Sequence, residues 1–283
     1  MVRPSAKRDA VKYLKVGYAV SERRACKAIN IPRSTQRYRK IADDSSSIRG
    51  QIKDLAGEHR RYGYRRIHVL LRRSGLAVNH KRTYRIYREE NLSVRKKIRR
   101  KLPTHLRVAT ALPTSPNERW SMDFVSDRLM SGKRIKMLTV IDDYSKECPL
   151  IYVDTSITGS KITELLDNIN RVLPKTIISD NGPEFISRSL DAWAYLKGIK
   201  LDHIRPGKPV DNCFIESFNG KLRDELLEEN IFNNLEHARL LVENWRQQYN
   251  NFRPHSSLKN KTPMDFLRDL GYEKGETAKL NVA

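Results

Sequence analysis

Alternating apolar and polar residues identify the first strand of the C-terminal half of the chain. In the stretch RWSMDFVSD, residues 119–127, Trp120, Met122 and Phe124 fall on one side and Asp123 falls on the other. This period of two is typical of a strand with one buried face. A turn signal follows at residues 131–132, and short connections lead to two further strands, which predicts an antiparallel meander.

The rest of this half switches between helical and extended patterns. Helices are predicted at 158–173, at 187–198 and from about residue 211 onward, and further strands are predicted at 134–145, 149–155, 175–180 and 200–206. The order of three strands, helix, strand, helix, strand and helix predicts an α/β fold with a mixed sheet flanked by helices. A later amphipathic helix, at 235–250, is expected to cover the core.

Residues 21–40 have the pattern of two short helices joined by a turn. Ala25 and Ile29 are spaced for one face of the first helix. The break at 30–32 ends in a proline, which suits the first position of the next helix.

The same plan occurs again in the stretch YGYRRIHVLLRRSG. Ile67, Leu70 and Leu71 share one face of a helix that ends at Gly75, and Asn79 is placed to cap the helix that follows. The first third of the chain is therefore predicted to be all-α, with two helix-turn-helix modules.

The formal net charge of +22 is concentrated in this first third. Residues 1–111 hold 31 Lys and Arg against 8 Asp and Glu, whereas residues 112–283 are close to neutral. A cationic block joined to a nearly neutral globular part predicts a module that binds a polyanion, and nucleic acid is the leading candidate. An anionic membrane surface is the weaker alternative, because the block lacks a long amphipathic helix rich in Trp or Phe.

The second helix of each module is the predicted DNA-reading element, since such helices dock in the major groove and contact phosphates. The candidate DNA contacts in the two modules are Arg33, Ser34, Thr35, Arg37, Arg65, Arg66, Lys81, Arg82, Arg85 and Arg88. The alternative is a pair of small helical hairpins with solvated arginine faces. A basic segment with three prolines, at 92–118, is predicted to link the modules to the C-terminal half.

Membrane, secretion and zinc-binding signals are missing from the sequence. No run of 18 apolar residues and no apolar signal-peptide region is present, and Cys26, Cys148 and Cys213 match no zinc spacing. Reduced thiols predict a cytoplasmic protein, and binding to nucleic acid would place it at the nucleoid.

A carboxylate follows the apolar strand in the stretch TIISDNGPEF, where the chain then breaks at Asn-Gly-Pro. This residue, Asp180, would lie next to Asp123 if their strands were parallel neighbours. A third carboxylate, Glu216, is predicted on the polar side of the helix that follows. A turn-capping Asp and a solvent-facing Glu are the alternatives from composition alone.

Three clustered carboxylates repel one another unless a cation neutralises them. Hard oxygen ligands with open positions suit Mg²⁺ or Mn²⁺. Two such ions, roughly 3.5–4 Å apart, can activate the attacking oxygen and stabilise the leaving oxygen of a phosphoryl transfer. The sequence therefore raises the hypothesis of a two-ion site for nucleic-acid chemistry.

The sequence contains four motifs: WSMDF, SDNGPEF, RPGKPVDNCFIESFNGKLRDE and YNNFRPHSSL. Through these motifs and the 35 residues between Asp180 and Glu216, it resembles bacterial transposases of the insertion-sequence-three family. These are Asp-Asp-Glu recombinases whose catalytic core is similar to retroviral integrase. The resemblance covers nearly the whole chain. It implies an RNase H-like core with a five-stranded sheet, and Asp123, Asp180 and Glu216 as the metal-binding catalytic triad.

The resemblance also implies function. The helical modules would bind the terminal inverted repeats of the element, and the core would use two Mg²⁺ or Mn²⁺ ions to cleave DNA and to join a 3′-hydroxyl to target DNA. A homodimer or a larger assembly on DNA is expected, and a partner or fusion from an upstream reading frame is an open alternative. Other open functions are a phage or integrative-element integrase, a non-catalytic DNA-binding repressor and an RNase H-like nuclease that never joins strands.

Five segments follow from this interpretation: helix-turn-helix modules at 1–45 and 46–95, a basic linker at 96–114, the catalytic core at 115–230, and a C-terminal helix and tail at 231–283. Further candidate DNA contacts near the triad are Lys208, Asn212, Lys221 and Arg223. Asn212 would either steady the site or contact DNA. Asp142 and Asp143 are expected to form a strand-end turn, and the RPHSS segment, 253–257, has no predicted role beyond packing.

Overall fold

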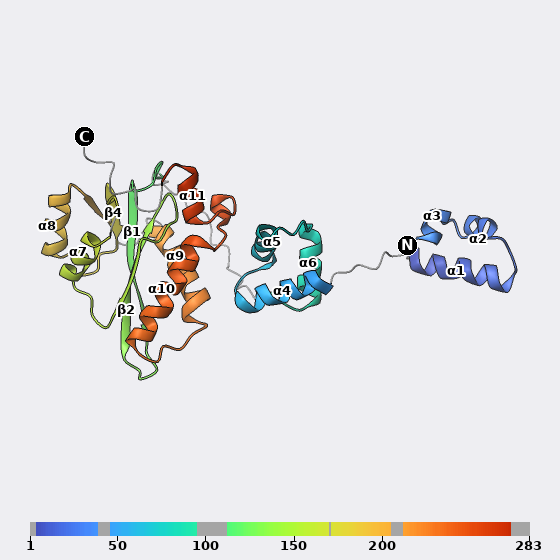
Figure 1. Ribbon diagram of the computed structural model, residues 1–283, viewed down its shortest axis with the longest axis horizontal. Helices are drawn as coiled ribbons and strands as arrows, with labels where there is room; N and C mark the ends of the chain where they lie inside the picture. Colours follow the sequence, from blue (N-terminus) through green and yellow to red (C-terminus); the bar gives the residue numbers. More distant parts are fainter. Residues whose placement is uncertain (1–3, 39–45, 95–111, 170, 205–211, 273–283) are drawn as a thin grey trace. The chain divides into compact units, whose positions relative to one another are not determined.

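The computed structural model describes residues 4–38, 46–94, 112–169, 171–204 and 212–272 (Figure 1). The chain divides into two compact units, Met1–Gln51 and Ile52–Ala283. Most of the predicted basic linker at 96–114 lies outside the described residues, as does Lys208.

The first unit is built from three helices, α1 (Pro4–Gly17), α2 (Glu22–Ala28) and α3 (Arg33–Arg37). Their small core contains Val11, Ala25 and Cys26. Asn30 adopts a left-handed conformation, with φ of 51°, in the turn between α2 and α3, which confirms the predicted helix-turn-helix. Helix α1 was not predicted.

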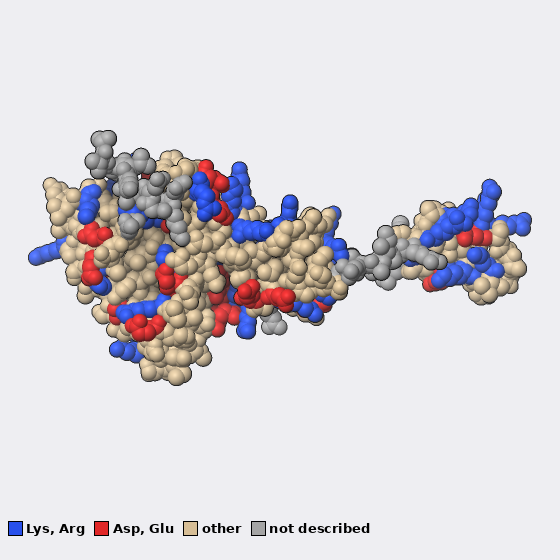
Figure 2. Space-filling model, viewed as in Figure 1, with Lys and Arg blue, Asp and Glu red and all other residues tan. Residues whose placement is uncertain are grey.

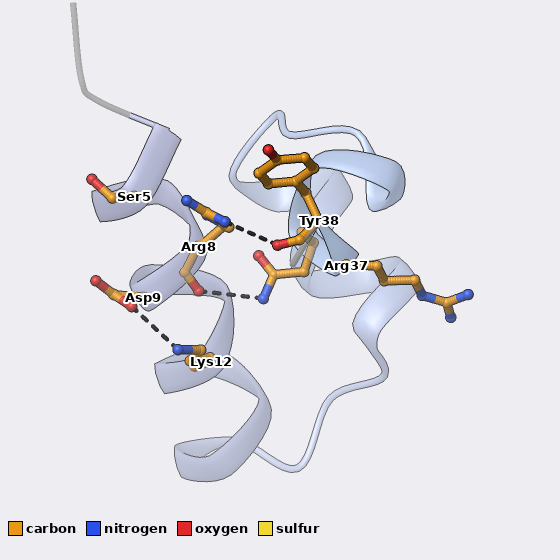
Figure 3. A pocket seen from close by; sticks show the side chains of 7 residues that line it. Ser5, Arg8, Asp9, Lys12, Arg37 and Tyr38 are labelled. Carbon is orange, nitrogen blue, oxygen red and sulfur yellow. Dashed lines mark hydrogen bonds and ion pairs between the residues drawn. The ribbon is translucent and has the colours of Figure 1, made fainter. Parts of the chain in front are cut away.

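Contacts between α1 and α3 close this unit at one end (Figure 3). The side chain of Gln36 donates to the Arg8 carbonyl oxygen over 3.4 Å, and the Arg8 guanidinium donates to the Tyr38 carbonyl oxygen over 3.2 Å. A polar pocket lies here, lined by Ser5, Arg8, Asp9, Lys12, Gln36, Arg37 and Tyr38.

A second helical group contains α4 (Ser46–Glu58), α5 (Tyr64–Arg73) and α6 (His80–Glu89). The predicted apolar face of α5 is buried, and the side chain of Asn79 accepts a 2.9 Å hydrogen bond from the Lys81 N–H at the start of α6. Gly75 has a φ of 87°, a conformation that glycine adopts without strain. The second helix-turn-helix-like module is therefore confirmed, with α4 as an additional helix.

The C-terminal part is a five-stranded sheet in the order β3-β2-β1-β4-β5. Its strands are β1 (Arg119–Arg128), β2 (Arg134–Asp142), β3 (Leu150–Asp154), β4 (Thr176–Ser179) and β5 (Lys200–His203). Strands β1, β2 and β3 pair antiparallel, whereas β4 pairs parallel to both β1 and β5. The predicted mixed sheet and the order of its elements are confirmed.

Helices cover both faces of the sheet (Figure 1). One face packs against α7 (Gly159–Asp167) and α8 (Arg188–Lys197), and the other packs against α9 (Cys213–Leu222) and α10 (Leu235–Asn251). The remaining elements are a π-helical turn, η2 (Arg223–Leu227), a short 3-10 turn, η3 (Ser256–Leu258), and α11 (Pro263–Asp269).

The alternation in β1 divides its side chains between these two cores. Trp120 and Met122 belong to the cluster under α7 and α8, and Val125 belongs to the cluster under α9 and α10. Asp123 shares the Val125 side, so the strand period alone directs this carboxylate toward α9.

Two predicted boundaries change in the structure. The helix expected at 158–173 ends at Asp167, and Asn168 caps it by donating to the Glu164 carbonyl oxygen from both its backbone N–H and its side chain, over 3.1 and 2.9 Å. The helix expected from about residue 211 begins at Cys213, next to residues outside the described part of the chain.

Within the described ranges, no helix is both long and apolar enough to span a bilayer. Cys26, Cys148 and Cys213 are free thiols, of which Cys26 and Cys148 are buried.

Candidate active site

The register between β1 and β4 brings two of the predicted carboxylates together. Trp120 lies opposite Ile177, and Ser121 lies opposite Ile178. The same offset of 57 residues, continued for two positions, places Asp123 beside Asp180. Adjacent strands are about 4.8 Å apart, so the two side chains leave neighbouring strands at one level of the sheet.

Asp180 also shapes the turn that follows β4. Its Oδ1 accepts a 3.0 Å hydrogen bond from the Gly182 N–H. A Cβ at position 182 would lie 3.0 Å from that same oxygen and 3.5 Å from Glu184, so a larger residue there would crowd the carboxylate. The turn-capping role and a ligand role are therefore compatible, since the turn hydrogen bond engages only one oxygen.

Helix α9 carries the third carboxylate. Ile215, Phe218 and Leu222 bury one side of this helix against the sheet, and Glu216 is exposed beside them. Asn219, three residues after Glu216, lies on the adjacent turn of the helix. Asn219 is only 7% exposed, although it is a polar residue on the helix that carries the exposed Glu216.

A hydrogen-bonded chain explains the burial of Asn219. Its Nδ2 donates to Asp123 Oδ2 over 2.7 Å, and its Oδ1 accepts from the Thr139 hydroxyl over 2.9 Å. The same hydroxyl lies 3.0 Å from the Asp123 carbonyl oxygen. Asn219 therefore ties the helix that carries Glu216 to the strand that carries Asp123.

The pKa of Asp123 is affected by burial, by hydrogen bonds and by the other two carboxylates. Burial raises the pKa of Asp123, and the negative charges of Asp180 and Glu216 raise this pKa further. Hydrogen bonds from the Phe124 N–H and from Asn219 favour the ionised form and lower it. The net pKa of Asp123 lies above its usual value, chiefly because the side chain is buried, and the two neighbouring carboxylates add to the rise.

The donor chemistry of this site fits a hard divalent cation. Asp123, Asp180 and Glu216 offer only oxygen ligands, and a cation would relieve the repulsion among them. Among the residues that the structure describes, however, no three His, Cys, Asp or Glu side chains are grouped closely enough to hold a metal ion. A metal site shared by the three carboxylates is therefore a proposal that rests on their donor chemistry.

The carboxylates at the end of β2 have a different role. Asp142 is fully buried and accepts hydrogen bonds from the Asn117, Tyr144 and Ser145 N–H groups. Asp143 pairs with Arg119 over 2.7 Å. These contacts confirm the expected strand-end turn.

The candidate DNA contacts on α3 and α6 lie mostly on the surface. Figure 2 shows Lys and Arg side chains gathered on α1–α3, whereas the core displays both signs of charge. Arg33 and Arg37 each pair with Glu22, over 3.4 and 2.8 Å. The exposed candidates are Arg33, Ser34, Arg37, Arg65, Lys81, Arg85 and Arg88, and the half-buried ones are Thr35 and Arg82.

Four other candidates lie near the core. Arg66 pairs with Glu225 over 3.1 Å, which makes it a contact within the protein, and we remove it from the DNA-binding set. Asn212 is 4% exposed, which favours the steadying role over DNA contact. Arg223 is exposed, whereas Lys221 is half-buried and its pKa is lowered to about 8 by burial and by nearby arginines.

Sequence reasoning missed three residues that hold this region together. Thr139 had no signal, because a Thr within a strand is ordinary. Asn219 had one signal, its spacing of three from Glu216 on one helix. Arg253, in the RPHSS segment, is 2% exposed and binds Glu225 through two nitrogens, at 2.8 and 2.6 Å.

Comparison with known proteins matches the chain from residue 43 to residue 263 to three family profiles. Two family profiles described as integrase core domain match residues 113–209 and 197–263, and a third, described as HTH-like domain, matches residues 43–101. Together they account for the sheet, for the helix that carries Glu216 and for α5 with α6.

Relatives match along most of the chain. The uncharacterized 31.7 kDa protein of insertion element IS407 from Burkholderia multivorans is 47% identical over 250 residues, covering 87% of this chain and 90% of that protein. The uncharacterized 39.2 kDa protein of insertion element IS476 from Xanthomonas euvesicatoria is 41% identical, covering 97% of this chain and 80% of that protein.

A more distant relative has a transposase name. Transposase InsD of insertion element IS2D from Escherichia coli strain K12 is 26% identical over 240 residues, covering 80% of this chain and 79% of that protein. The matches to insertion-element proteins and to integrase core profiles agree with the architecture found here. The chain therefore belongs to the insertion-sequence-three family of transposases and is an enzyme of the transposase and integrase type.

Proposed function

We propose that this transposase binds the terminal inverted repeats of its element through its N-terminal modules. Its core then cleaves DNA and joins the freed 3′-hydroxyl to a second DNA strand. Asp123, Asp180 and Glu216 are the proposed catalytic carboxylates. The observation that carries the proposal is the β1–β4 register, which sets Asp123 beside Asp180, together with the Asn219 bond that draws α9 to the same place.

Divalent ions suit this site on chemical grounds. We propose that the three carboxylates hold two Mg²⁺ ions, with Mn²⁺ as the alternative. Such ions activate an attacking oxygen and stabilise a leaving oxygen in phosphoryl transfer. The chain's own part is to fix the ligands, because Gly182 orients Asp180 and Asn219 orients Asp123.

Cleavage and joining place the same demands on the protein. Both are in-line displacements at phosphorus, with water or a 3′-hydroxyl as the nucleophile. One rigid set of carboxylates on a sheet and a helix can serve both steps, because neither step requires the protein to form a covalent bond. Two ends of the element must meet, so we propose a dimer or a larger assembly on DNA; a partner or fusion from an upstream reading frame is the alternative composition.

Asn219 gives a test of how the carboxylates are held. The substitution Asn219→Ala removes the donor to Asp123 Oδ2 and one of the two partners of the Thr139 hydroxyl. We expect DNA cleavage to fall by about 10–100-fold, as is usual when a group that orients a metal ligand is lost. The Mg²⁺ concentration that gives half-maximal cleavage should rise, while DNA affinity stays the same.

The matched control for this test is Asn251→Ala. Asn251 is an exposed helical asparagine whose side chain contacts only Gln247 on its own helix. Its substitution should leave cleavage and Mg²⁺ dependence unchanged. Normal cleavage by a folded Asn219→Ala protein would contradict the proposed positioning of Asp123.

The function itself is tested with the wild-type protein on duplexes that end in the element's terminal repeat. One duplex is intact and the other has a pre-cut 3′-hydroxyl. We expect cleaved and joined products in Mg²⁺, none in EDTA, and little product on duplexes of random sequence. Cleavage without any joined product would instead identify a nuclease, and binding without either product would identify a repressor.

A further inference from the structure

A buried carboxylate lies just beyond the catalytic helix. Glu225, in the π-helical turn η2 that continues α9, is half-buried overall with a side chain only 8% exposed. Arg253 binds it through two nitrogens, and the Arg66 Nη1 donates to the same oxygen, Oε1, over 3.1 Å. One carboxylate therefore joins two arginines from segments far apart in the sequence.

The two arginines come from different parts of the protein. Arg253 follows α10 in the core, and its guanidinium also lies over the Tyr249 ring. Arg66 belongs to the first turn of α5, in the helix-turn-helix-like module, and lies over the Tyr62 ring. Glu225 thus connects that module to the segment that directly continues the helix carrying Glu216.

Two more arginines of the module extend this contact. Arg61 donates to Glu228 over 2.7 Å and lies 3.0 Å from Glu229. Arg73, at the end of α5, donates to the Phe252 and Asn260 carbonyl oxygens over 2.7 and 2.8 Å. We name Arg61, Arg66 and Arg73 the docking arginines.

The π-helical turn explains how the core presents its acidic groups. This turn contains Asp224 and Glu225 and leads directly to Glu228 and Glu229, while Leu222 and Leu226 both remain buried. Leu226 keeps the turn packed on the core, so the acidic groups have a fixed support. Such turns are rare and often occur at functional positions.

The docking arginines leave the second helix of the module uncovered. On α6, Lys81, Arg85 and Arg88 are exposed while Arg61 and Arg66 contact the core. Docking and DNA binding therefore use different faces of the module. A DNA contact through α6 does not require the ion pairs on α5 to break.

We propose that the α5–α6 module stays docked on η2 while α6 binds DNA, so that the docking arginines set the position of bound DNA relative to Glu216. This inference rests on the proposed function. It makes Arg61, Arg66 and Glu225 positioning residues for the reaction, with no contact to the reacting atoms. It also gives the RPHSS segment a role, because Arg253 holds Glu225 in place for Arg66.

Arg61 is the position at which this can be tested without unfolding the core. Removing either partner of the buried Arg253–Glu225 pair would leave an uncompensated charge and endanger folding. The Arg61 and Glu228 side chains are 27% and 57% exposed, so both tolerate reversal of charge. The three full-length variants are Arg61→Glu, Glu228→Arg and the double variant with both changes, compared with Arg72→Glu as control.

Arg72 is a suitable control because it is an exposed residue of α5 and its substitution changes the net charge by the same amount. We expect Arg61→Glu to slow joining of a pre-cut end by about tenfold relative to Arg72→Glu. Its DNA affinity should fall no further than that of Arg72→Glu. The double variant should recover part of the lost joining rate, because position 228 then attracts position 61 again while Asp224 and Glu229 still repel it.

Hydrogen exchange of the amides in residues 220–229 gives a readout that is independent of activity. Exchange there should be faster in Arg61→Glu than in wild type and should slow again in the double variant. Equal exchange in wild type and Arg61→Glu would overturn the docking proposal. So would unchanged joining in Arg61→Glu, or joining and DNA affinity that fall together.

The joining rate and the hydrogen exchange together show whether the docking proposal or the proposed function has failed. If the wild-type protein joins no DNA, the proposed function fails, and hydrogen exchange alone decides whether the docking contact exists. If the wild-type protein joins DNA and the reversed pair restores no activity, the docking proposal fails and the function stands.

Discussion

Replacing any one of Asp123, Asp180 and Glu216 with its amide is expected to reduce cleavage of a terminal-repeat duplex by about a thousandfold or more. The amides keep the size of each side chain but remove the charge that binds a cation. Metal ions supply several kcal/mol of transition-state stabilisation in such sites, and about 4 kcal/mol corresponds to a factor of roughly a thousand. Gel analysis of labelled DNA measures the loss.

The control is Asp127→Asn, which lies on the same strand and the same face as Asp123, four residues further along. This change should leave cleavage nearly unaffected. All four variants should melt normally and bind DNA as the wild type does. Substantial cleavage by any of the three amide variants would remove that residue from the proposed catalytic set.

Binding to duplex DNA is expected to weaken steeply with salt. If the modules neutralise 6–10 phosphates, the affinity of the full chain should fall by about 10³–10⁵ between 50 and 200 mM salt. In a plot of log affinity against log salt concentration, the slope should become shallower by about three in the triple variant Lys81→Ala, Arg85→Ala, Arg88→Ala. Each lost phosphate contact accounts for about one unit of slope. Fluorescence anisotropy across a salt series gives both quantities.

A second triple variant removes the same charge from the core, at the exposed residues Lys133, Arg134 and Lys259. Replacing these three with Ala should leave the slope almost unchanged. A larger loss of slope from the core variant than from the α6 variant would place the main DNA-binding surface on the core, contrary to the charge distribution of the chain.

The spacing of apolar residues in the sequence was sufficient to predict the strands and helices that bury a regular apolar stripe or face. The alternation of Trp120, Met122 and Phe124 predicted β1, whereas the parallel β1–β4 pairing was considered only as a condition and is shown by the structure. The stripe of Ile67, Leu70 and Leu71 predicted α5 in the same way. In each case the apolar residues that repeat along the sequence are the ones buried in the fold, so the local sequence pattern is enough to predict the element.

Elements with little buried surface were missed. Helix α1 buries only Val11 and α4 buries only Ile52 among their described residues, so neither has the apolar stripe that marks a helix in sequence. Their presence depends on contacts with neighbouring helices, which the local pattern does not contain.

The polar contacts of the site were missed for a related reason. Whether Asn219 faces solvent or Asp123 depends on the angle at which α9 crosses β1, and the helical wheel does not specify that angle. The pairing of Arg66 with Glu225 spans 159 residues. A surface arginine in a basic module gives no local sign that its partner is a carboxylate of the same chain.

The central claim is that one carboxylate site performs both cleavage and joining, and the most direct test is joining of a pre-cut end by the Glu216→Gln protein. The substrate has a free 3′-hydroxyl and so bypasses the first step. The single-site account predicts joined product at about a thousandth of the wild-type rate or less. Joining at close to the wild-type rate would show that Glu216 serves hydrolysis alone, and would contradict the account.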